Sequence, residues 1–216
     1  MGDKIAFSLI RFINMTRPFL IAVVLLISLV ASGQKKQAGV PPILTKKELE
    51  REATNHKCVR KENKSFSVRL KNYPFNLAAQ IQFVSFKGTI DTSEYHDLKM
   101  NDSLPRLNDT VCYSKLEEVK TITFSQADEL TDILYNYGYA GQTSLGSFAD
   151  CYLPRNAILF LNPQGKVFEF IEVCFECRKT EVSSKNISLG QMCDQKISML
   201  KDLFRTVGIE YGVKER

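Results

Sequence analysis

Four of the six cysteines in this 216-residue chain are the residues whose type and spacing could do chemistry. They are Cys151, Cys174, Cys177 and Cys193, in the pattern C-x22-C-x2-C-x15-C. Such thiols can form disulfides, bind a metal ion such as zinc as a four-thiolate site, or exchange disulfides with other molecules. The even number of cysteines favours structural disulfides, and the metal and exchange sites stay open as alternatives. Cys58 and Cys112 receive no role.

The turn "NPQG" at residues 162–165 determines which of these cysteines can meet. Its proline and glycine predict a type I turn followed by a left-handed glycine, between two apolar strands. Opposed residues in such a hairpin have Cβ atoms about 4.5 to 5.5 Å apart, which is near the span of a disulfide. The predicted pairs are Phe160 with Phe168, Ile158 with Phe170, Asn156 with Glu172 and, by extension, Cys151 with Cys177.

Cys174 needs a different partner if the strand continues to Cys177. Residues three apart on a strand point to opposite faces and lie about 10 Å apart, beyond the roughly 7 Å Cα limit for a disulfide. Cys193 is the nearest candidate, because it stands in the first turn of a helix predicted for residues 191–207. A helix N-terminus would also lower the pKa of that thiol.

Polar residues beside the cysteines are the candidate ligand contacts. These are Arg155, Asn156, Glu172 and Glu176. Carboxylates at the end of a strand are more often solvated or paired than functional. The two histidines lie in a basic segment and a polar loop, and no hydrolase motif occurs, so no catalytic residue is predicted.

Alternating apolar residues predict strands in the N-terminal part of the domain. Phe66, Val68 and Leu70 alternate with polar residues, and a second apolar run covers residues 78–86 with Ile81 on one face. The two runs predict a hairpin.

Two helices follow from apolar stripes with helical spacing. The first has a predicted capping box at Ser125 and Asp128 and ends before Gly138, and the second ends at Gly208. Together with the strands they predict an α+β fold, an antiparallel β-sheet of four to six strands with two helices on one face.

The amino terminus predicts export. A basic segment precedes the apolar residues 19–30, and small residues follow at 31–33, which is typical of a signal peptide. An uncleaved N-terminal membrane anchor helix is the alternative. We therefore divide the chain into a signal or anchor (1–33), a basic linker (34–64) and one extracytoplasmic domain (65–216), periplasmic or secreted.

The charge of the chain limits its partners. The net charge is +5, and the first 33 residues contribute three bases and one acid to it. So small a surplus argues against nucleic acid. An unknown protein or envelope component is the expected partner, with the membrane if the N-terminal segment stays attached.

The stretch "CYLPRNAILFLNPQGKVFEFIEVCFEC", with its C-Y-x-P-R-N and C-F-E-C ends, resembles a group of uncharacterised exported bacterial proteins. The resemblance implies export and a small α+β domain, and no activity. We expect a non-catalytic extracytoplasmic binding module with a structural cysteine cluster and no cofactor. The alternative is a zinc- or thiol-dependent enzyme that uses the four cysteines.

Overall fold

A computed structural model describes residues 44–87, 103–144 and 151–214. The chain divides into two units after Thr45, and every element below belongs to the unit Lys46–Arg216. The predicted signal or anchor segment and His96 lie outside the described residues. Within the three described ranges, no helix has both the length and the apolar character needed to span a membrane.

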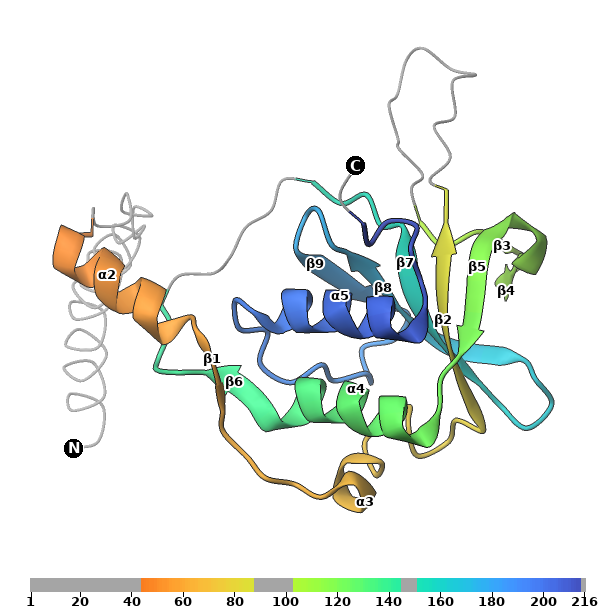
Figure 1. Ribbon diagram of the computed structural model, residues 1–216, viewed down its shortest axis with the longest axis horizontal. Coiled ribbons are helices and arrows are strands. Elements are labelled where there is room, and N and C mark those ends of the chain that lie inside the picture. The colour runs from red at the N-terminus through yellow and green to blue at the C-terminus, as the bar shows by residue number, and fades with distance from the viewer. Residues whose placement is uncertain (1–43, 88–102, 145–150, 215–216) are drawn as a thin grey trace, which may run out of the picture. The chain divides into compact units, whose positions relative to one another are not determined.

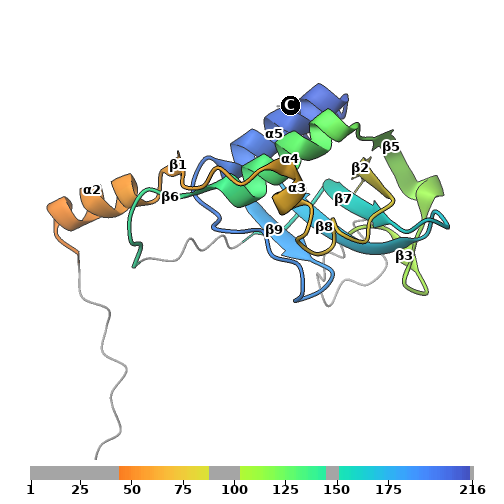
Figure 2. The ribbon, with the colours of Figure 1, turned by 90° about the horizontal axis from the view of Figure 1, so that it is seen from below.

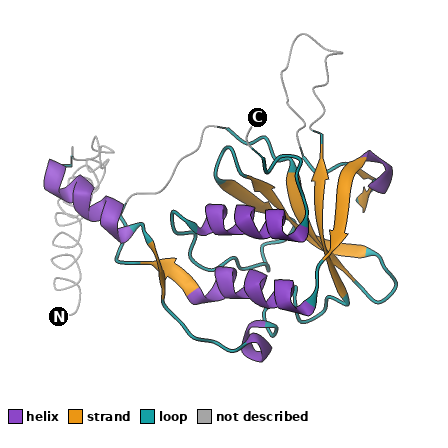
Figure 3. Cartoon of the chain, in the orientation of Figure 1, coloured by secondary structure: helices purple, strands orange, loops and turns teal. Residues whose placement is uncertain are grey.

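The described residues form helices and antiparallel strands, which confirms the predicted α+β class (Figures 1 and 3). The helices are α2 (Lys46–Asn55), α3 (Phe66–Arg69), α4 (Phe124–Asn136), α5 (Lys196–Val207) and the short 3-10 helix η1 (Tyr113–Lys115). The strands are β1 (Cys58–Arg60), β2 (Gln80–Phe86), β3 (Arg106–Leu107), β4 (Thr110–Val111), β5 (Leu116–Thr121), β6 (Tyr137–Tyr139), β7 (Asn156–Leu161), β8 (Val167–Cys174) and β9 (Lys179–Val182).

The main sheet has five strands in the order β5-β2-β7-β8-β9, and all neighbours are antiparallel. Helices α4 and α5 lie side by side over one face of it (Figures 1 and 2). Phe83 and Ile158 face these helices, whereas Val84 and Leu159 belong to a second apolar cluster on the opposite face. Both faces are therefore covered, and every residue of β7 is buried.

The turn at "NPQG" forms as predicted. The Asn162 amide donates to the Lys166 carbonyl at 2.9 Å, and the Gly165 amide donates to the Asn162 carbonyl at 2.9 Å. Gly165 has a φ of +75°, in the left-handed region that glycine adopts without a steric penalty.

The register beyond this turn differs from the prediction by one residue. Leu161 pairs with Val167, but Phe160 pairs with Glu169, so Phe168 is the extra residue of a β-bulge. The predicted pairs at Phe160, Ile158 and Asn156 were therefore wrong. The observed partners are Glu169 for Phe160, Ile171 for Ile158 and Val173 for Asn156.

The segment predicted as a strand at residues 66–71 is instead the short helix α3. The alternation of apolar and polar residues that predicted a strand does not match the observed burial. Phe66 and Leu70 pack on the core, and Arg69 is buried as well. Arg69 forms ion pairs with Asp128 and, at 2.7 Å, with Asp132 of α4. These ion pairs hold α3 against α4.

Part of the predicted basic linker 34–64 is folded. Residues Lys46–Asn55 form α2, and β1 pairs with β6. The Arg60 guanidinium also meets the Asp132 carboxylate at 2.6 Å, and its hydrogen bonds hold the pKa of Asp132 below its usual value. The folded unit thus begins at Lys46 rather than at Ser65.

The ends of the two long helices also differ in detail from the prediction. The capping box of α4 uses Thr123 and Gln126 instead of Ser125 and Asp128, and the Asp128 carboxylate pairs with Arg69. Helix α5 begins five residues later than expected, so residues 191–195 lie outside it. Its left-handed C-cap at Gly208 is as predicted.

Two disulfides close loops of very different length. Cys58 bonds to Cys193 across 135 residues, and Cys151 bonds to Cys177 across 26 residues. Both are compatible with an oxidising, extracytoplasmic environment.

We expect the longer loop to contribute more to stability. In the chain-entropy model, loops of these lengths stabilise the fold by about 5 and about 3.5 kcal/mol. Replacing both Cys58 and Cys193 by serine should therefore lower the free energy of unfolding more than replacing Cys151 and Cys177. Urea unfolding of the two double variants measures the order, and the reverse order would contradict this prediction.

Candidate functional site

The predicted bond between Cys151 and Cys177 is present, with the two Cα atoms 5.7 Å apart. Strand β8 ends at Cys174, and the chain turns through residues 175–178 before β9 begins. Arg178 closes that turn with a φ of +53°. The turn brings Cys177 to the segment that precedes β7, so the bond forms outside the strands and does not depend on their register.

Cys174 is a free thiol and is 1% exposed. Its Sγ accepts the backbone N–H of Cys177 at 3.2 Å and donates to the Leu153 carbonyl at 3.4 Å. The expected partnership with Cys193 was wrong, because Cys193 precedes α5 and is bonded to Cys58. The other free thiol of the described residues is the half-buried Cys112.

The four thiols of the proposed metal site are thus divided between two disulfides and one buried thiol. In residues 44–87, 103–144 and 151–214, no group of three or more histidine, cysteine, aspartate or glutamate side chains is placed to hold a metal ion.

The predicted polar contacts serve different parts of the fold. Glu172 is buried on the sheet face opposite the helices, where it accepts hydrogen bonds from the Leu104 amide and, at 3.0 Å, from the Tyr152 hydroxyl. Burial raises the pKa of Glu172 above its usual value, and these two hydrogen bonds oppose that rise. The acid therefore ties the segment around Leu104 to the sheet.

Each of the other three predicted residues makes contacts of its own. The buried Asn156 amide donates to the Tyr211 carbonyl at 2.9 Å, which anchors the C-terminal segment. The half-buried Arg155 donates to the Pro154 carbonyl at 3.2 Å, and Glu176 is exposed in the turn between the cysteines.

A polar groove of about 510 Å³ lies elsewhere, at the C-terminal end of α4. It is lined by Lys61, Glu62, Lys64, Asn72, Leu134, Tyr135, Tyr137, Gly138, Ser188, Gly190 and Gln191. We call it the α4-end groove. Its volume falls within the range of small-molecule sites, about 300 to 1,000 Å³.

One wall of the α4-end groove is held by Asn136, the last residue of α4. Its side-chain amide donates to the Lys64 carbonyl at 3.1 Å, and its side-chain oxygen accepts the Lys64 N–H at 3.0 Å. Its backbone carbonyl accepts the N–H groups of Lys61 and Glu62 at 2.8 and 3.2 Å. A free carbonyl at a helix end is thereby satisfied, and the two lysines are fixed beside it.

The buried ammonium of Lys196 holds the floor of the groove. Its Nζ donates to the carbonyls of Leu134, Tyr137 and Leu189 at 2.8, 3.0 and 3.4 Å. Lys196 is completely buried, and this burial lowers its pKa to about 8. The junction of α4 with β6 and the segment before α5 therefore share a single cation.

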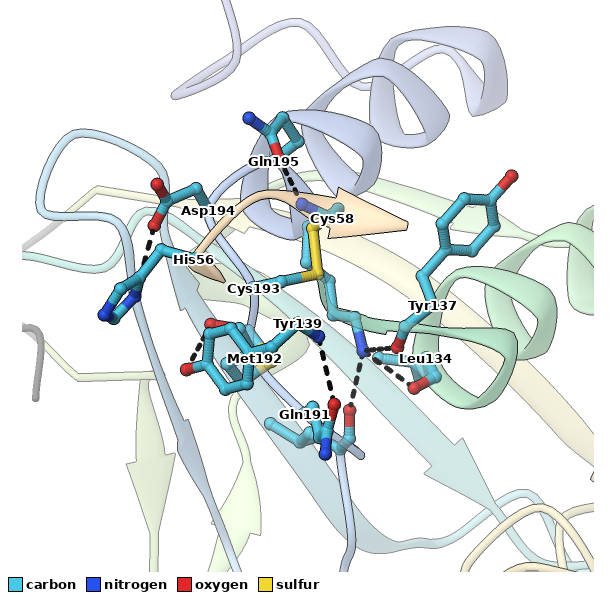
Figure 4. The surroundings of a disulfide bond; sticks show 12 residues. His56, Cys58, Leu134, Tyr137, Tyr139, Gln191, Met192, Cys193, Asp194 and Gln195 are labelled. Carbon is cyan, nitrogen blue, oxygen red and sulfur yellow. Dashed lines mark hydrogen bonds and ion pairs between the residues drawn. A yellow bond between two sulfur atoms is a disulfide. The ribbon is translucent and has the colours of Figure 1, made fainter. Parts of the chain in front are cut away.

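The Cys58–Cys193 disulfide joins strand β1 to the segment before α5 (Figure 4). Next to it, the side-chain oxygen of Gln195 accepts the Cys58 amide at 2.6 Å, and that of Gln191 accepts the Tyr139 amide at 3.0 Å. The paired strands β1 and β6 are thus joined to the 188–195 segment by one covalent bond and by hydrogen bonds.

Gly190 allows a close approach of two backbone segments in the groove. It has a φ of +64°, and a Cβ placed on it would lie 2.3 Å from the Leu134 carbonyl oxygen. No larger residue fits without moving the backbone of α4 or of this segment.

Tyr135 lines the α4-end groove and carries an unsatisfied polar group. Its ring packs edge-on against Phe75 at 5.9 Å, and among the described residues its buried hydroxyl has no hydrogen-bond partner. Burial raises the pKa of Tyr135, so the hydroxyl is neutral at physiological pH and can donate a hydrogen bond. An unpaired buried hydroxyl is costly to the folded state.

None of these groove residues was singled out from the sequence. Cys58 was left without a role, Lys61 and Lys64 belonged to the predicted linker, and Lys196 stood beside the apolar stripe of α5. The odd feature that could have indicated the site was a lysine next to Ile197, inside an otherwise apolar helical face.

The lowered pKa of Lys196 predicts a pH dependence of stability. Because the pKa is about 8 in the folded protein and about 10.4 in an unfolded chain, the unfolded state binds more protons between these values. The free energy of unfolding should therefore rise with pH, by up to about 3 kcal/mol relative to a Lys196→Met variant.

Urea unfolding of both proteins at pH 7.5, 9 and 10 measures this difference. Both should carry Cys112→Ser and Cys174→Ser, which prevent disulfide exchange at high pH. A difference that does not change with pH would mean that Lys196 titrates with an ordinary pKa.

Comparison with known proteins finds no matching family model, no matching curated protein and no matching solved structure. The resemblance of the Cys151–Cys177 region to uncharacterised exported bacterial proteins therefore stays a prediction. The function of this chain is inferred from the α4-end groove and the cysteines alone.

Proposed function

We propose that this protein is an exported, non-catalytic binding module whose α4-end groove takes a small polar ligand with a carboxylate or phosphate group. The observation that carries the proposal is a polar groove of about 510 Å³ whose lining includes two lysines and Tyr135, a residue with a buried, unpaired hydroxyl. A group of this kind is expected where a ligand atom completes the hydrogen bond.

The charges around the groove favour an anion. Lys61 and Lys64 line it with a single carboxylate, Glu62. Below them, Lys196 is protonated at neutral pH, since its pKa of about 8 lies above 7. Its ammonium lies 3.5 Å from the position that a Cβ of Gly190 would take. The two lysines at the opening raise the local concentration of anions and hold them when bound, and the buried Lys196 adds positive charge behind the lining.

The groove chemistry supports binding rather than catalysis. Its lining among the described residues contains neither histidine nor cysteine, which most often supply acid–base and nucleophilic groups. The polar part of the lining consists instead of two ammonium groups, the Glu62 carboxylate, and amide and hydroxyl groups, which recognise a polar molecule.

Export completes the proposal. The signal or anchor segment predicted for residues 1–33 would carry the chain across a membrane, where the two disulfides persist. The ligand is then an acidic small molecule or fragment found outside the cytoplasm.

Nuclear magnetic resonance titration tests the proposal with defined probes. N-acetylmuramic acid supplies a carboxylate and glucose 6-phosphate a phosphate, with N-acetylglucosamine and glucose as uncharged controls. We expect an acidic probe to shift the amide signals of Lys61, Lys64 and Gly190, and the uncharged sugars to leave them unchanged.

Two variants separate binding from folding. Tyr135→Phe removes only the unpaired hydroxyl, so it should weaken binding about fivefold to tenfold while the free energy of unfolding stays equal or rises. Lys61→Gln with Lys64→Gln should weaken binding at least tenfold. The matched control is Lys47→Gln with Lys166→Gln, which removes the same charge from exposed sites. Equal binding by Tyr135→Phe and wild type would contradict the proposal.

A further inference from the structure

The turn between β8 and β9 brings together three sulfur atoms, two of which are already bonded. Cys177 is disulfide-bonded to Cys151, and its backbone N–H donates to the Sγ of the free Cys174 at 3.2 Å. The thiol thus contacts the residue that carries one half of the disulfide. The thiolate of a cysteine in such a position is the nucleophile in disulfide exchange.

We propose that Cys174 exchanges with the Cys151–Cys177 disulfide, which makes the end of this hairpin a thiol–disulfide exchange site. The Cys174 thiol loses a proton, which is matched by the one that Cys151 gains, and the thiolate attacks the Sγ of Cys177. The Cys174–Cys177 bond forms as the Cys151–Cys177 bond breaks, and Cys151 leaves as a thiolate that takes up a proton. One disulfide and one thiol are present before and after, so no oxidant or reductant is consumed.

The exposure of the three residues determines where the free thiol lies before and after this exchange. Cys174 and Cys177 are 1% and 6% exposed, whereas Cys151 is exposed. In the described form the reactive thiol is hidden, and after exchange the thiol is at the surface. The Cys151 thiolate is then the group that would attack a disulfide of another molecule, forming a mixed disulfide and releasing that molecule's second thiol.

The backbone at this turn can accommodate the new bond. Residues 175–178 form a turn rather than a continued strand, which removes the separation of about 10 Å that would keep Cys174 and Cys177 apart. The ladder pair Cys174 with Lys179 closes the turn just outside it. The proposal does not rest on the α4-end groove, and it can fail or hold independently of that groove.

Alkylation of the folded, oxidised protein tests the exchange. The protein carries Cys112→Ser, so that Cys174 is its one free thiol among the described residues. Iodoacetamide is added at pH 8 without denaturant, and the sample is quenched with acid and digested by a protease that cleaves after glutamate. Glu172 and Glu176 flank Cys174, so Cys174 and Cys177 leave in different peptides and each disulfide is identified by its mass.

We expect the label to accumulate on Cys151, together with peptides linked through Cys174 and Cys177. Introducing Cys174→Ser should reduce labelling of Cys151 at least tenfold, to the level seen at Cys58 and Cys193. These two residues form the reference disulfide, and label on them would report unfolding instead of exchange.

Two results would overturn the proposal. The first is label on Cys174 with the Cys151–Cys177 disulfide intact. The second is equal labelling of Cys151 with and without Cys174. If Cys174→Ser prevents folding, Cys174→Ala serves as the second variant, and the intact reference disulfide and circular dichroism spectrum establish that it is folded.

Discussion

The ammonium of Lys196 is the interaction on which the groove side of this protein depends. A cation removed from water costs several kcal/mol unless its hydrogen-bonding capacity is used, and here three N–H groups meet three carbonyls. The acceptors belong to the end of α4, to β6 and to the segment before α5. These segments must therefore be in place together, because displacing any one of them leaves the buried charge short of a partner.

The parts of the fold that sequence reasoning predicted are those specified by local chemistry. The turn at "NPQG" follows from proline and glycine, and the apolar stripe of α4 follows from helical spacing. The position of the α4 cap could not be read so directly, because Ser125 and Thr123 both begin acceptable capping patterns. In the structure Thr123 is the N-cap, and the Asp128 carboxylate pairs with Arg69, which is a tertiary contact.

The candidate site was harder to predict because its partners are far apart in sequence. Cys151 and Cys177 stand at the ends of one hairpin, so their bond was predictable, although the assumed strand register was not correct. Cys58 lies 135 residues from Cys193, in a segment rich in lysine. The composition of that segment is typical of a linker. The strand pairing of β1 with β6 is what turns this segment into part of the fold.

The bulge at Phe168 shifts the pairing of β8 with β7 by one residue. Because side chains alternate between the two faces of a strand, one inserted residue exchanges the inward and outward sets for the rest of β8. Ile171 and Val173 thereby join the helix-covered layer, and Glu172 joins the other. If Phe168 paired with Phe160 without a bulge, Glu172 would face the apolar layer beneath the helices. The bulge therefore determines which side chains of β8 lie under the helices.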